Sequence, residues 1–141
     1  MLHMTFTSSF FKGAVAALIL FLVSDFVWHT MLLGNFYMAK IEAINGGAMT
    51  EMTFPPSILL FHIIAALVST YFVMRTAHSF GEGAKNGAFL GLFVSAGINL
   101  VNNALLTKWD TTIVAVDMLW GIVTGLLAGM VIVWATGRAK A

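Results

Sequence analysis

The sequence predicts an all-α fold, an integral membrane four-helix bundle that forms a single membrane domain over residues 1–141. Composition is the first reason, because 60% of the 141 residues are hydrophobic and 9% are charged, with a mean hydropathy of +0.93. Soluble domains carry about 25% charged residues. The second reason is the presence of four separate apolar segments, each with about the 20 residues that a helix needs to cross a ~30 Å hydrocarbon core.

We expect the membrane spans at about residues 10–33, 56–74, 84–106 and 112–136. In the first span, Lys12 precedes an apolar run in the manner of a signal peptide. The run continues to Leu33 without a small-x-small cleavage site, so we interpret it as an uncleaved span. The second span follows Pro55-Pro56, which suits a helix start because proline's missing N–H is no loss there.

Charged residues predict the orientation. Five lysines and arginines lie on the N-terminal flank, the second loop and the C-terminal tail, whereas two lie on the opposite side. The positive-inside rule therefore places both termini in the cytoplasm (N-in, C-in).

The net charge is +1 without a basic cluster, so nothing indicates a nucleic-acid partner. The chain lacks cysteine, which excludes disulfides and thiolate metal ligands.

The long first loop, residues 34–54, contains a predicted short helix. Apolar side chains between Phe36 and Ile44 have near-helical spacing with charged residues among them. This pattern is typical of an amphipathic helix at the membrane interface, here on the external side. The sequence Asn45-Gly46-Gly47 is expected to end that helix.

Small residues recur at every fourth position of the third span, which places them on one face of a helix. The stripe begins with glycine and turns polar at its far end: Gly83, Gly87, Gly91, Ser95, Asn99 and Asn103. In a membrane, small residues let a neighbouring backbone approach closely. We therefore expect tight packing in the near half and a polar site in the far half. The fourth span has a similar packing surface at Gly121, Gly125 and Gly129.

Strongly polar side chains of all four spans fall in the predicted outer half, judged at ~1.5 Å of helix per residue. The candidate ligand-binding residues are Asp25, Trp28, His29, His62, Asn99, Asn102, Asn103, Asp117 and Trp120. The spacing Asp-x-x-Trp occurs in both the first and the last span, as Asp25 with Trp28 and Asp117 with Trp120. This repeat is compatible with a two-fold pseudo-symmetry between the two spans.

A charged carboxylate in hydrocarbon costs about 2.5–3.5 kcal/mol, so both aspartates need partners, and three interpretations stay open. In the first, the network is structural, with Asp25 paired to His29 or His62 and Asp117 bonded to the asparagines. In the second, a divalent metal cofactor is held by mixed nitrogen and oxygen ligands, or the cluster carries ions or protons; the metal ligands are then Asp25, His29, His62 and Asp117. In the third, the site binds a small organic or lipid-like molecule walled by tryptophan.

The sequence therefore favours binding or transport of an ion, metal or small solute through this polar cluster. The alternative function is that of a structural accessory subunit or assembly factor of a larger membrane complex. No nucleophile stands in a recognisable catalytic motif, so a non-enzymatic role is favoured over an enzyme. A bundle of this size has little room for a water-filled pore, so transport would predict a homo-oligomer in the lipid bilayer.

Short motifs are spread over most of the chain. They are Asp25-Phe-Val-Trp28 followed by Phe36-Tyr37, then Gly87 and Gly91 with Ile98-Asn99-Leu100-Val101-Asn102 and Trp109, and finally Val116-Asp117-Met-Leu-Trp120-Gly121. With these motifs the sequence resembles a family of small bacterial membrane proteins catalogued as domain of unknown function 2177. The resemblance implies four spans and a multi-pass location in the bacterial cytoplasmic (inner) membrane. The chain departs from the family pattern at Ile98 and Asn99, where the family carries tyrosine and aspartate, so an ion or metal site that needs that aspartate would be lost here.

Overall fold

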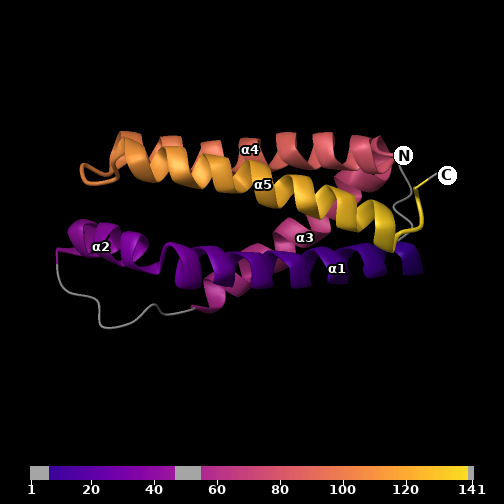
Figure 1. Cartoon of the computed structure of the whole chain (residues 1–141), viewed down its shortest axis with the longest axis horizontal. Coiled ribbons are helices and arrows are strands. Elements are labelled where there is room, and N and C mark those ends of the chain that lie inside the picture. The colour runs from indigo at the N-terminus through magenta and orange to yellow at the C-terminus, as the bar shows by residue number, and fades with distance from the viewer. Residues whose placement is uncertain (1–6, 47–54, 140–141) are drawn as a thin grey trace.

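The computed structural model describes residues 7–46 and 55–139, and every element of secondary structure in this part of the chain is a helix (Figure 1). Four helical segments are long and apolar enough to cross a membrane. They are Ser8–Leu32, which consists of α1 (Ser8–Phe26) and the π-helix η1 (Val27–Leu32), then α3 (Pro56–Thr76), α4 (Phe80–Leu105) and α5 (Thr111–Ala135). The predicted all-α fold with four membrane-crossing helices is confirmed.

The spanning helices run alternately up and down the bundle, so α1 begins and α5 ends at the same end (Figure 1). We call this end the terminal end. The short helix α2 (Gly34–Asn45) and the turn between α4 and α5 lie at the opposite end, which we call the α2 end. The assignment of these ends to the two sides of the membrane stays a prediction.

Side chains placed just before the helices define where they begin. Thr7, Ser79 and Asp110 each accept a hydrogen bond from a backbone N–H in the first turn of α1, α4 and α5, which satisfies donors that have no partner within the helix. The cap at Ser79 explains why α4 begins at Phe80, earlier than the apolar pattern predicts. Helix α3 begins at Pro56, as the Pro55-Pro56 pair predicts.

The first span does not end as a regular α-helix. Residues Val27–Leu32 form a π-helix, closed by a hydrogen bond of 2.9 Å from the Leu33 N–H to the Trp28 carbonyl. The chain then turns at Leu33 into α2, which ends at Gly46 with a φ of 74°. The predicted helix in the first loop is thus present, its place at the membrane interface stays a prediction, and residues 47–54 of that loop lie outside the described residues.

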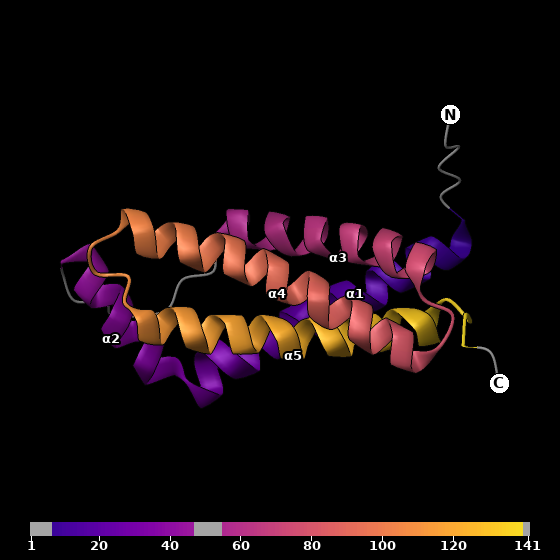
Figure 2. The ribbon, with the colours of Figure 1, turned by 90° about the horizontal axis from the view of Figure 1, so that it is seen from above.

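The closest packing in the bundle joins α4 and α5, which cross in the first half of α4 and diverge toward the α2 end (Figure 2). Three glycines of each helix face one another in antiparallel pairs: Gly83 with Gly129, Gly87 with Gly125, and Gly91 with Gly121. A Cβ atom on Gly87 or Gly91 would overlap the carbonyl oxygen of the facing glycine. The two predicted packing surfaces are therefore the two sides of one contact.

The remaining surface suits lipid. Buried apolar side chains gather between α1, α3 and α5 near the terminal end, where Val73, Ile132 and Val133 are fully buried. Large apolar side chains cover the outside, and Phe93 and Leu105 are 77% and 75% exposed. An apolar exterior around a small core is what a helix bundle surrounded by hydrocarbon requires, because lipid tails are as apolar as the core.

We expect Gly91→Ala to lower the free energy of unfolding by about 1–3 kcal/mol, because the added methyl group forces the backbones of α4 and α5 apart. Gly97→Ala is the matched control on the same helix, since a Cβ there meets nothing within 4 Å. Thermal unfolding in detergent, followed by circular dichroism, compares the two. Equal melting temperatures for both variants would show that the glycine contact does not limit stability.

Candidate functional site

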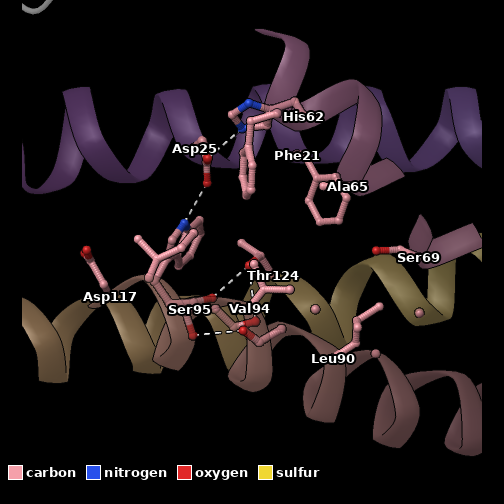
Figure 3. Close-up of a pocket in the computed structure, with 18 of the residues that line it drawn as sticks. Phe21, Asp25, His62, Ala65, Ser69, Leu90, Val94, Ser95, Asp117 and Thr124 are labelled. Atoms are coloured by element: carbon pink, nitrogen blue, oxygen red, sulfur yellow. Dashed lines mark hydrogen bonds and ion pairs between the residues drawn. The ribbon is translucent and has the colours of Figure 1, made fainter. Parts of the chain in front are cut away.

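A cavity of about 290 Å³ lies between α1 and α3 on one side and α4 and α5 on the other (Figure 3). All four spanning helices contribute to its walls. Its strongly polar side chains belong to the α2 half of the bundle and come from every spanning helix: Asp25, His29, His62, Asn99, Asp117 and Trp120. Polar residues that the sequence places at one depth of four spans thus line the same cavity.

Asp25 is held by two side chains from other helices (Figure 3). One carboxylate oxygen lies 2.7 Å from Nε2 of His62, and the other accepts a hydrogen bond of 2.8 Å from the indole N–H of Trp120. The carboxylate therefore links α1 to both α3 and α5. This geometry agrees with the structural interpretation of the sequence, in which Asp25 finds a histidine partner.

The hydrogen bonds of His62 fix the number of protons in this pair. Nδ1 of His62 lies 2.7 Å from the carbonyl oxygen of Ile58, and a carbonyl only accepts, so Nδ1 carries a hydrogen. The contact between Nε2 and Asp25 then needs one more proton, on either the imidazole or the carboxylate. Asp25 and His62 together therefore share one proton and carry no net charge, which removes most of the cost of burying the carboxylate in an apolar bundle.

Asp117 accepts a hydrogen bond from α2, a helix outside the four spans. Tyr37 of α2 is 6% exposed, and its hydroxyl accepts a hydrogen bond of 3.1 Å from the indole N–H of Trp28 and donates one of 2.5 Å to Asp117. Burial raises the pKa of the Tyr37 hydroxyl above its ordinary value, and the neighbouring Asp117 adds to the increase. Tyr37 thus remains a hydrogen donor to Asp117 at neutral pH.

The two Asp-x-x-Trp motifs exchange partners across the bundle. Trp120 of α5 donates to Asp25 of α1, while Trp28 reaches Asp117 through the hydroxyl of Tyr37. The indole rings of Trp28 and Trp120 stack with their centroids 4.4 Å apart and their planes 5° apart. Such a stack contributes about 0.5–1.5 kcal/mol beyond the area it buries. The repeated motif therefore marks one shared contact between the first and last spans.

Of the three predicted asparagines, one belongs to the site. Asn99 is buried, donates to the Ser95 carbonyl at 3.0 Å and accepts from the indole N–H of Trp109 at 3.1 Å, and it lines the cavity together with Asp117. Asn103 is exposed and donates to the Trp109 carbonyl in the turn between α4 and α5. Neither Asn102 nor Asn103 lines the cavity.

The predicted metal ligands do not form a common coordination site. Within residues 7–46 and 55–139, no three His, Asp or Glu side chains come together as a group that could hold a metal ion. His29 lines the cavity, but its Nδ1 donates to the backbone carbonyl of Asp25 and its ring packs on Tyr37. A metal at Asp25 would also have to displace the contacts from His62 and Trp120.

Tyr37 and Trp109 are the site residues that sequence reasoning missed. The sequence places Tyr37 in the short helix predicted for the first loop, although its position after the first Asp-x-x-Trp motif is a usable signal. Trp109 stands among the family motifs without a predicted partner. A second contact docks α2, because Lys40 forms an ion pair with Asp110, the residue that caps α5.

Removing the Tyr37 hydroxyl, in Tyr37→Phe, leaves Trp28 and Asp117 without a shared hydrogen-bond partner. We expect the free energy of unfolding to fall by about 1–3 kcal/mol. Tyr71→Phe is the control, because Tyr71 is 37% exposed and its ring, which carries the contact with Arg75, is kept. Equal stability of the two variants, measured by detergent unfolding, would show that Tyr37 does not hold α2 in place.

The ion pair at Asp110 predicts a pH dependence. Hydrogen bonding from Lys40, with a further contribution from the Ile113 N–H, lowers the pKa of Asp110. A lowered pKa stabilises the folded state above the unfolded value of ~3.9, and this contribution is lost as pH falls through the folded pKa. Asp110→Asn keeps a good helix cap, so it is expected to lose less melting temperature than the wild type between pH ~5 and ~3. Identical losses would exclude a role for the charge.

Comparison with known proteins identifies the family. The family described as "Predicted membrane protein" (DUF2177) matches residues 10–134, a range that includes every cavity-lining side chain described above. No curated protein and no solved structure matches the chain. A match over most of the chain shows membership, and the chain belongs to the DUF2177 family of predicted membrane proteins.

Proposed function

We propose that this membrane protein binds a small amphipathic molecule in the cavity between its four spanning helices. The observation that carries the proposal is the division of the cavity walls. At the α2 end they present carboxylate, imidazole, amide and indole groups, and toward the terminal end they are mainly apolar side chains and glycine, with the hydroxyls of Ser69 and Thr124. A volume of about 290 Å³ lies at the lower limit of small-molecule sites, which measure ~300–1,000 Å³.

Glycine creates the free space at the apolar end. Gly87, Gly91 and Gly125 line the cavity as well as the contact between α4 and α5. The wall on this side is therefore backbone, and no side chain of these residues fills the space in front of it. Phe21, Leu90 and Val94 provide apolar contacts around it. An apolar body packs against such walls through dispersion contacts, each worth about 0.1–0.2 kcal/mol.

The surface of the bundle supports entry from the lipid. Phe61 of α3 and Ile98 of α4 line the cavity and are also 43% and 46% exposed. Their side chains thus separate the cavity from the exterior between α3 and α4. A ligand already dissolved in the bilayer could pass between them by rotation of these two side chains, without crossing the polar end.

Binding is better supported than transport. Toward the terminal end, the hydroxyl groups on the cavity walls are those of Ser69 and Thr124, among the described residues. The Thr124 hydroxyl already donates to the Trp120 carbonyl of its own helix. A hydrated ion moving along the bundle would therefore meet few oxygen ligands beyond the polar cluster, and a dehydrated charge is costly in such a place.

The test uses 1-aminoanthracene, an uncharged fluorescent probe at neutral pH, with protein in phosphatidylcholine nanodiscs and empty nanodiscs as the blank. We expect one saturable site per chain. Ala65→Phe, which fills the cavity from α3, is expected to weaken binding at least ~10-fold. The matched control is Ala115→Phe, because Ala115 is exposed on α5 and does not line the cavity.

Equal affinity of Ala65→Phe and Ala115→Phe for the probe would place the probe outside the cavity and contradict the proposal. If the wild type binds no probe and instead purifies in mild detergent with stoichiometric partner proteins, the accessory-subunit alternative becomes the better account of the chain.

A further inference from the structure

The two aspartates of the cavity differ in their charge balance. Asp25 shares a proton with His62, whereas Asp117 has no ion-pair partner among the residues that the structure describes. Its neighbours Tyr37 and Asn99 are uncharged. His29 is the basic group nearby, but it makes its hydrogen bond to the Asp25 carbonyl and lies beyond ion-pair distance of Asp117.

The partners of Asp117 are arranged to donate. The Tyr37 hydroxyl accepts from Trp28, so its single hydrogen points to Asp117. The amide oxygen of Asn99 accepts from Trp109, so the NH₂ group, which also donates to the Ser95 carbonyl, is the part of this amide that can act on the carboxylate. Hydrogen-bond donors favour the charged form of a carboxylate. The cavity therefore contains a carboxylate that accepts hydrogen bonds, and no basic side chain of the described residues forms an ion pair with it.

Trp120 presents an aromatic surface beside this carboxylate. It follows Asp117 by three residues on α5, so the two side chains leave the helix on the same side, one turn apart. Its N–H is bonded to Asp25 and one face is covered by Trp28, which holds the ring rigid while it lines the cavity. Among aromatic side chains, tryptophan attracts cations most strongly.

We infer that the ligand of the cavity is an organic ammonium ion with an apolar body, held by the Asp117 carboxylate and the Trp120 ring. This inference rests on the proposed function and names the class of molecule that the site takes. The ammonium group supplies the positive charge that Asp117 lacks. The apolar body extends along Leu90 and Val94 toward the glycine wall, where a bare metal ion would meet few oxygen ligands.

The experiment compares two compounds of nearly the same shape and different charge. At neutral pH, 1-aminoadamantane is an ammonium ion and 1-adamantanol is uncharged. Each competes with 1-aminoanthracene for protein in zwitterionic phosphatidylcholine nanodiscs, so that lipid charge does not concentrate the amine. We expect the wild type to bind the ammonium at least ~10-fold more tightly than the alcohol.

Asp117→Asn is expected to abolish this preference, because the asparagine amide carries no charge to attract the ammonium ion and still accepts from Tyr37. Asp117→Glu keeps the carboxylate and is expected to keep the preference. Asp110→Asn is the charge-matched control, since it removes the acidic group that caps α5 and does not line the cavity. A second variant, Trp120→Phe, tests the ring with Asp117 intact and is expected to reduce the preference.

Equal affinity of the wild type for both compounds would overturn the inference while leaving cavity binding in place. A preference that persists in Asp117→Asn would overturn it as well, because another group would then hold the cation. Failure of the fluorescent probe itself to bind would remove the proposed function, which is a separate and recognisable result.

Discussion

The contact between the backbones of α4 and α5 is the constraint on which the rest of the structure depends. Facing glycines bring the two helices so close that a single Cβ would strike a carbonyl oxygen. This contact sets the register of the pair: Ser95 of α4 and Asp117 of α5 lie one turn beyond the pair of Gly91 and Gly121, and Asn99 lies one turn further along α4. The polar end of the cavity is therefore positioned by residues that have no side chain.

The same glycines also shape the space inside the bundle. They line the cavity as bare backbone, so the volume that larger side chains would fill remains free. Tight packing and free space are thus two effects of one pattern. A chain of 141 residues can therefore form an internal cavity. Its helices still use most of their surface for contacts with lipid or with one another.

The bundle buries two carboxylates, and the groups that compensate for their burial differ. Asp25 is neutralised by His62 and fixes α1 against α3 and α5, which is a structural task. Asp117 has no ion-pair partner among the described residues and accepts from the Tyr37 hydroxyl of α2. The π-helix before α2 contributes here, since it ends the first span and turns the chain so that Tyr37 enters the site. Departures of this kind are frequent near functional sites.

The helices, their number and the depth of the polar residues follow from the sequence, because hydrocarbon imposes one length on every span and makes each intramembrane polar residue conspicuous. The glycine stripes and the paired Asp-x-x-Trp motifs were likewise visible as helical periodicity. Sequence spacing could not separate Asn99 from Asn102 and Asn103, since all three share one broad face and only the position of α5 distinguishes them.

Composition and periodicity by themselves determined the membrane class, the helical fold and the set of candidate residues. The tertiary structure alone decided which partner each polar group has: His62 for Asp25, Tyr37 for Asp117, and the exchange of the two tryptophans. The physical reason is that periodicity reports which face of a helix a residue occupies. Pairing depends on how helices distant in sequence rotate and cross, and that is set by packing between them.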